Sequence, residues 1–108
     1  MSSDIRPSPK REQTGNVRII TFTTGQARDV ENVLATELEG QTDGMGEGHI
    51  LLDFTNVEFI TSVELGTLIG LHKKMRDSGG RLTLFNLSPQ VFEVFTTTRL
   101  EKLLGICR

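Results

Sequence analysis

The 108-residue sequence has few of the residues on which several classes of protein depend, with one cysteine, three prolines, no tryptophan and no tyrosine. The single cysteine, Cys107, excludes an internal disulfide and a zinc site built from several cysteines. No apolar run approaches the roughly 18 residues that a membrane-spanning helix requires. The polar start of the chain does not fit a signal peptide, so we expect a cytoplasmic protein that does not associate with a membrane.

The chain also lacks the excess of basic residues that nucleic-acid binding requires. Its formal net charge is −2 at pH 7, and it has no Trp or Tyr on which bases could stack, so we do not expect a nucleic-acid partner. The charge is unevenly placed, because residues 29–64 contain no Lys or Arg but nine acidic residues: Asp29, Glu31, Glu37, Glu39, Asp43, Glu47, Asp53, Glu58 and Glu64. This stretch predicts either an acidic face that attracts a basic protein or a solvated helix face followed by an acidic loop.

The length and the composition, with 36% hydrophobic and 24% charged residues, fit one folded domain. We predict that domain over residues 17–108. Residues 1–16 contain two prolines and three serines and are expected to form a flexible tail or a weak edge strand.

Alternating patterns of apolar residues predict an α/β fold. β-branched or apolar runs indicate strands at 17–23, 49–54 and 81–87, and helical spacing indicates helices from Ala27 to a cap at Gly40, at 62–77 and from Pro89 to Phe95. A last amphipathic turn is expected from Leu100 to Leu104. Because helices of this length connect parallel strands, the order β-α-β-α-β-α-α predicts a small open mixed sheet with helices packed on it.

Several motifs that could carry catalysis or cofactor binding do not fit their required context. The glycines at 44, 46 and 48 follow a helix and precede a strand, which is the reverse of a phosphate-binding loop, so residues 41–48 are predicted to form a flexible connector. His49 and His72 lack the spacing of metal ligands. No Gly-x-Ser-x-Gly motif accompanies the serines. We therefore expect a protein that is not an enzyme and has neither a cofactor nor a metal.

The sharpest local prediction is a capping box formed by Thr61 and Glu64, directly before an apolar-periodic run. Ser62 then becomes the first residue of the helix, where its hydroxyl lies at the positive end of the helix dipole and a phosphate would be electrostatically favoured. This position follows a parallel strand, at the edge where open α/β sheets carry their functional surface. Gly66 and Gly70, four residues apart on one helix face, would allow another backbone to approach closely.

The motifs resemble those of the STAS domain of bacterial anti-sigma factor antagonists. The resemblance rests on ILLDFTNVEFITSVELGTLIGL at 50–71, GGRLTLFNLSPQVFEVF at 79–95 and TRLEKLLGI at 98–106. It implies a STAS-type fold and a partner that is both an anti-sigma factor and a serine kinase of the histidine-kinase-like ATPase type. In this family, phosphorylation of a serine in Asp-Ser-Ser-Gly breaks the complex.

The sequence departs from the family at that motif, because Val63 occupies the position of the usual phosphoacceptor and Glu64 that of the glycine. Either Ser62, or less readily Thr61, takes over as acceptor, or the domain binds its partner without this switch. Further on, Arg99 stands where the family commonly has glycine. The hydroxyl cluster at 96–98 is expected to be a capping run before the final helix rather than a modification site.

The resulting hypothesis is a non-enzymatic anti-sigma factor antagonist, monomeric or weakly dimeric, that contacts its partner through residues 61–66 at the start of a helix. The contact residues are expected to be Thr61, Ser62, Val63, Glu64 and Gly66. The alternative is a structural STAS subunit of a larger regulatory assembly or of a transporter, with no phosphorylation cycle.

Overall fold

The computed structural model describes residues 9–24, 26–39 and 48–107, so the glycine-rich connector predicted at 41–48 lies almost wholly outside the described residues. Strands and helices alternate along the chain, as the sequence predicts. The elements are β1 (Lys10–Thr14), β2 (Val17–Thr21), α1 (Ala27–Glu39), β3 (His49–Asp53), α2 (Ser62–Asp77), β4 (Arg81–Phe85), α3 (Pro89–Thr97), the 3-10 helix η1 (Leu100–Lys102) and β5 (Gly105–Cys107).

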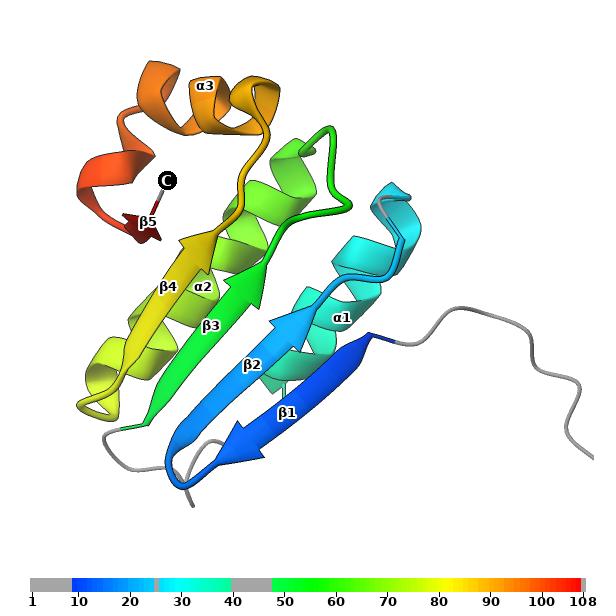
Figure 1. The fold of residues 1–108 in the computed structure, drawn as a ribbon. Helices are drawn as coiled ribbons and strands as arrows, with labels where there is room; N and C mark the ends of the chain where they lie inside the picture. Colours follow the sequence, from blue (N-terminus) through cyan, green and yellow to red (C-terminus); the bar gives the residue numbers. More distant parts are fainter. Residues whose placement is uncertain (1–8, 25, 40–47, 108) are drawn as a thin grey trace, which may run out of the picture.

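The strands form one mixed sheet in the order β1-β2-β3-β4-β5. β1 is antiparallel to β2, whereas the pairs β2–β3, β3–β4 and β4–β5 are parallel. Figure 1 shows α1 and α2 side by side behind the sheet, with α3 beyond the carboxyl end of β4. The predicted α/β class and the parallel pairing of strands 49–54 and 81–86 are therefore confirmed.

The core lies between the sheet and the helices α1 and α2. Alternate strand residues on this face are buried, and they meet apolar residues from one face of each helix. Burying each of these side chains contributes about 1.5–3 kcal/mol. The main contributors are Ile20, Ile50, Leu52 and Leu84 from the sheet with Val30, Leu34, Leu68, Leu71 and Met75 from the helices.

Both edges of the sheet differ from the pattern of three strands that the sequence predicts. At one edge, residues 10–14 form β1, which the sequence leaves open between a tail and an edge strand, and Gly15 with φ 61° allows the tight turn into β2. At the other edge, the turn predicted over 100–104 is a 3-10 helix at 100–102, followed by the unpredicted strand β5. A strand of three residues is too short to show an alternating pattern.

The acidic stretch at 29–64 does not form one continuous acidic face. Glu37 is 5% exposed and its carboxylate pairs with Arg18 at 2.9 Å and with Arg11 at 3.3 Å, which ties α1 to β1 and β2. Glu64 is completely buried. Two of the acidic side chains are therefore internal, and the charge of one of them, Glu37, is paired with two arginines from outside the stretch.

The turn from α2 into β4 depends on the two glycines that end the helix. Gly79 has φ 78°, a conformation that favours glycine. A Cβ atom on Gly80 would lie 2.4 Å from the carbonyl oxygen of Gly48, so a side chain there would collide with backbone.

Within the described residues, no helix combines the length and the apolar character needed to cross a bilayer.

Candidate functional site

The capping box predicted from the sequence is present at the start of α2. The backbone N–H of Thr61 donates to Glu64 Oε1 at 2.6 Å, and the backbone N–H of Glu64 donates to Thr61 Oγ1 at 3.1 Å. These two bonds satisfy donors that the first turn of a helix otherwise leaves unpaired. Ser62 is the first helical residue, as predicted.

A contact that the sequence did not reveal links this cap to α1. The hydroxyl of Thr61 donates to Glu31 Oε2 at 3.1 Å while it accepts from the N–H of Glu64. The hydroxyl therefore bridges two helices. Because the hydroxyl is already engaged in both roles, Thr61 has a structural place in the site.

Glu64 positions the site and does not face a partner. Its side chain has no exposed surface, and its Oε2 atom is buried without a hydrogen-bond partner. Burial raises the pKa of this carboxyl, hydrogen bonding of the carboxyl to the backbone N–H and the side chain of Thr61 acts in the opposite direction, and the nearby carboxylate of Glu31 raises it further. The expectation that Glu64 contacts a partner is therefore wrong, because a partner cannot reach a fully buried side chain.

The surface around the cap combines a hydroxyl with exposed apolar groups. Ser62 is exposed, Val63 is 57% exposed, and Phe59, just before the cap, is 74% exposed. Two exposed apolar side chains within four residues of each other make this region a candidate interaction surface. We call Phe59, Ser62, Val63 and Gly66 the α2 corner. The sequence did not single out Phe59, although a bulky apolar residue outside any periodic pattern was a signal for it.

The two glycines of α2 have different surroundings. A Cβ atom on Gly66 would meet nothing within 4 Å, whereas one on Gly70 would lie 3.5 Å from the methyl groups of Leu38 in α1. Gly70 thus faces a side chain of its own domain. Gly66 leaves the helix backbone of the α2 corner open to the outside.

The segment that leads from β3 to the α2 corner is held by hydrogen bonds. Asp53 Oδ1 accepts from the backbone N–H and the hydroxyl of Thr55 and from Asn86 Nδ2, which joins the carboxyl ends of β3 and β4. The side-chain amide of Asn56 donates to the carbonyl oxygen of Phe22 at 2.7 Å, which attaches the same segment to the end of β2. These hydrogen bonds therefore hold in place the segment that leads into the α2 corner.

The hydroxyl cluster at 96–98 lies at the end of α3. Thr96 donates to the carbonyl oxygen of Glu93, and Thr98 donates to those of Val94 and Phe95. The prediction that they cap the start of the final helix is wrong, because these hydroxyls bond carbonyl oxygens at the end of α3 and no side chain caps η1. Arg99 follows with φ 62° and ψ 19°, a left-handed conformation that favours glycine, the residue that the resemblance leads us to expect at this position.

The comparisons with known proteins place this geometry in a family. A sequence model of the STAS domain matches residues 8–108. The chain is 36% identical over 61 residues to an "Anti-sigma-B factor antagonist" of Listeria monocytogenes, and the match covers 56% of this chain and 54% of the relative. The chain thus spans about half the length of the curated relatives that it matches.

Solved structures share the same fold. An anti-sigma-factor antagonist (STAS) domain protein from Planctomyces limnophilus superposes with a TM-score of 0.73 at 22% identity, covering 91% of this chain and 87% of that one. The Bacillus cell fate determinant SpoIIAA in its phosphorylated form superposes with a TM-score of 0.68 at 22% identity, covering 94% of this chain and 92% of that one. At this level of identity, the likeness shows the fold alone.

Proposed function

Because this chain belongs to the STAS domain family, we propose that it is an anti-sigma factor antagonist, which binds an anti-sigma factor through the α2 corner. The printed name of the Listeria monocytogenes relative supports the antagonist role. As a protein that acts by binding, the chain needs no catalytic residues of its own. The proposed partner is a kinase-like anti-sigma factor of the histidine-kinase-like ATPase type, and the complex would form in the cytoplasm, where sigma factors act.

The observation that supports this proposal most strongly is the exposure of Phe59 and Val63, which lie on either side of the N-cap residue Thr61 in the chain. Covering a phenylalanine or valine side chain that water otherwise contacts contributes about 1.5–3 kcal/mol. Because the capping box and the Asp53 hydrogen bonds already fix the backbone here, binding loses little further conformational entropy. Gly66, which has no side chain, would let the partner's surface approach α2 closely.

We further propose that Ser62 is the residue through which a kinase regulates the complex. Its side chain is exposed and lies at the positive end of the α2 dipole, so a phosphate there would be stabilised in the free protein. The same phosphate adds about −1.5 to −2 charges beside Val63 and would have to be desolvated when a partner covers the corner. SpoIIAA, which has the same fold, is known in a phosphorylated form.

The direct test of the partner is a calorimetric titration of this protein into each purified ATPase-type anti-sigma factor of the source organism. We expect saturable 1:1 binding to one of them and release of its bound sigma factor on gel filtration. Binding to none of them would contradict the antagonist function.

The test of the regulation uses the anti-sigma factor that binds, together with ATP, followed by intact-mass measurement and mapping of the phosphopeptide. We expect one phosphate on the wild-type protein and none on Ser62→Ala, which should still bind. An unchanged mass for the wild type, with equal binding by Ser62→Ala, would mean that the complex forms without this switch. Labelling at another residue would move the regulatory site away from Ser62.

A further inference from the structure

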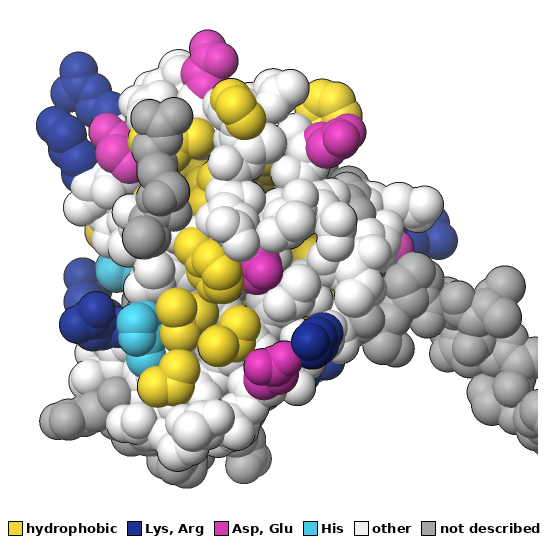
Figure 2. Space-filling view, in the orientation of Figure 1, with side chains coloured by type: hydrophobic (Ala, Val, Ile, Leu, Met, Phe, Trp, Pro, Cys, Tyr) yellow, Lys and Arg dark blue, Asp and Glu magenta, His cyan; other side chains and the backbone are white. Residues whose placement is uncertain are grey.

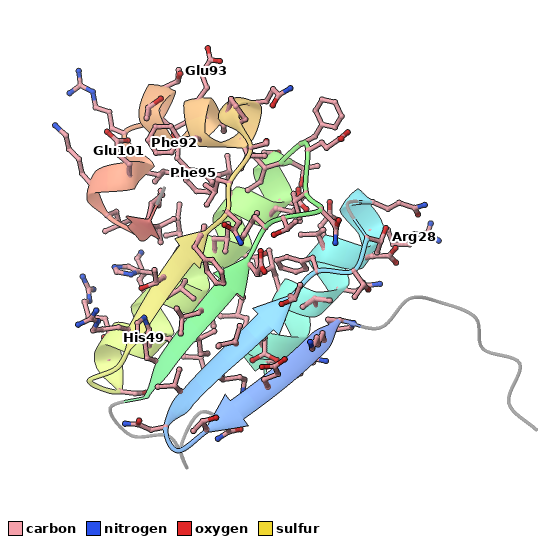
Figure 3. All side chains as sticks on the ribbon, viewed as in Figure 1. Arg28, His49, Phe92, Glu93, Phe95 and Glu101 are labelled. Carbon is pink, nitrogen blue, oxygen red and sulfur yellow. The ribbon has the colours of Figure 1, made fainter. Side chains whose placement is uncertain are left out.

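Glu31 of α1 lies against the cap from which the α2 corner is built. α1 and α2 begin at the same end of the molecule, as Figure 1 shows, and Glu31 is in the second turn of α1. The hydroxyl of Thr61 donates to Glu31 Oε2 at 3.1 Å. Figure 3 shows Arg28, in the first turn of α1, projecting on the side away from α2. The side chain of α1 that contacts the cap is therefore the carboxylate of Glu31 and not the guanidinium of Arg28.

The contact with Glu31 decides where the hydroxyl of Thr61 points its proton. A hydroxyl group rotates freely and donates one hydrogen bond. With its proton directed to Glu31, a lone pair of Thr61 Oγ1 accepts from the backbone N–H of Glu64 at 3.1 Å. Glu64 Oε1 in turn accepts from the backbone N–H of Thr61 at 2.6 Å. The three residues therefore form one continuous chain of hydrogen bonds from α1 to the first turn of α2.

α1 can serve as a fixed support because it is itself attached to the sheet. Val30 and Leu34, on either side of Glu31 in the chain, are completely buried in the core. Two turns further on, the carboxylate of Glu37 pairs with arginines of β1 and β2. The backbone that carries Glu31 is therefore held in place on both sides, and its carboxylate offers Thr61 an acceptor at a defined position.

We propose that Glu31 is a positioning residue for partner binding, which holds the first turn of α2 so that the α2 corner presents its apolar side chains in one orientation. This inference rests on the proposed function, because it assigns the binding of an anti-sigma factor to the α2 corner. Figure 2 shows exposed apolar and acidic groups at the end of the molecule where the chain passes from β3 into α2. Without Glu31 this surface would have to be ordered during binding, and that ordering lowers the affinity.

A second hydrogen bond between the same two helices provides a matched control. Lys74 Nζ donates to the carbonyl oxygen of Leu38 at 2.5 Å. Lys74 lies about 20 Å along α2 from Thr61, so this bond joins the helices far from the α2 corner. Lys74→Met removes the donor and keeps most of the aliphatic side chain. It therefore loses a link between α1 and α2 without a change at the corner.

The first experiment compares the affinity of the anti-sigma factor for the wild type, Glu31→Ala, Glu31→Gln and Lys74→Met by calorimetry, after urea unfolding has shown that all four proteins fold. Glutamine keeps an oxygen that can accept from Thr61. We expect Glu31→Ala to weaken binding about fivefold and the other two variants to bind as the wild type does. Unchanged binding by Glu31→Ala, or an equal loss in Lys74→Met, would overturn the proposal.

The second experiment needs no partner and measures amide hydrogen exchange by NMR in the free protein. We expect the N–H groups of Thr61 and Glu64 to exchange several times faster in Glu31→Ala than in the wild type or in Glu31→Gln. Unchanged exchange in Glu31→Ala would overturn the positioning role. A wild type that binds no anti-sigma factor would instead overturn the proposed function, and the exchange rates would still decide whether Glu31 holds the cap.

The charge of Glu31 gives a readout that a purely structural contact would not change. Burial raises the pKa of Glu64, and the carboxylate of Glu31 raises it further. Glu31→Gln removes this charge and keeps the acceptor oxygen. In a carbon-13 NMR titration we expect the pKa of Glu64 to be lower in Glu31→Gln than in the wild type, while the N–H of Glu64 exchanges at the wild-type rate. An unchanged pKa of Glu64 would contradict the placement of Glu31 beside the cap.

Discussion

Thr61 and Glu64 each donate a backbone N–H to the other's side chain, with N···O distances of 2.6 Å and 3.1 Å. The two residues between them, Ser62 and Val63, are both exposed. This reciprocal cap therefore fixes the direction in which the first turn of α2 presents its hydroxyl and its apolar side chain. The proposed binding surface depends on a structural feature of only four residues.

Replacing Thr61 should weaken the fold through the loss of its hydroxyl. In Thr61→Ala the N–H of Glu64 and the carboxylate of Glu31 both lose a partner, so we expect the free energy of unfolding to fall by about 1–2 kcal/mol. Thr61→Ser keeps the hydroxyl, so its free energy of unfolding should fall by only a few tenths of a kcal/mol. Urea unfolding of the two variants measures the difference, and equal losses would show that the hydroxyl does not support the cap.

The stability of the protein should fall as the pH rises through the titration range of Glu64. Burial raises the pKa of this carboxyl in the folded state, so the folded protein binds more protons than the unfolded chain in the interval between the ordinary pKa of a glutamate and the raised one. In that interval the contribution of Glu64 to the free energy of unfolding decreases with increasing pH, and above the interval this contribution is constant.

Glu64→Gln removes this titration while it keeps an oxygen that can accept from the N–H of Thr61. We therefore expect the stability of the variant, relative to the wild type, to rise with pH through the interval and then to level off. Urea unfolding from acid to neutral pH gives the comparison. A difference between the two proteins that does not change with pH would contradict a raised pKa at Glu64.

Gly66→Ala and Gly70→Ala should separate stability from binding. Alanine favours a helix by about 0.5–1 kcal/mol over glycine, and both positions can accept a Cβ atom, one in open space and the other at 3.5 Å from Leu38. We expect both variants to be at least as stable as the wild type. Only Gly66→Ala should weaken binding of the anti-sigma factor, by about tenfold, because only its methyl group projects from the α2 corner. Calorimetry on both variants tests this, and equal affinities would remove Gly66 from the binding surface.

Arg99 should be a position at which glycine stabilises the protein. Its φ of 62° costs a residue with a side chain about 1 kcal/mol relative to glycine. We expect Arg99→Gly to raise the free energy of unfolding by up to about this amount, and Arg99→Ala, which keeps a Cβ atom, to give no such gain. Thermal and urea unfolding of the two variants distinguish the backbone effect from the loss of charge. An equal gain in both would assign the effect to the charge.

The features predicted correctly from the sequence are those set by residues close in the chain. The capping box needs only Thr61 and Glu64, and the end of α2 is marked by Gly79, whose φ of 78° is a local backbone requirement. The parallel pairing of β3 with β4 followed from the length of the helix between them. Local patterns therefore gave most of the architecture.

The features missed from the sequence depend on contacts between distant segments. The hydroxyl of Thr61 reaches Glu31 thirty residues earlier, and the carboxylate of Glu37 joins Arg11 from twenty-six residues earlier. No periodic pattern signals such pairs. β5 is formed by pairing with β4 and has only three residues, and the only signal for the exposure of Phe59 was its position outside any periodic pattern.

The central claim, that the α2 corner is the surface that binds an anti-sigma factor, is tested most directly by calorimetry with Phe59→Ala and Leu103→Ala. Phe59 is 74% exposed at the corner, and Leu103, 40% exposed, lies outside it and serves as the control. We predict that Phe59→Ala weakens binding by about 2 kcal/mol, roughly thirtyfold, and that Leu103→Ala binds as the wild type does. Unchanged binding by Phe59→Ala, with the variant folded, would contradict the account.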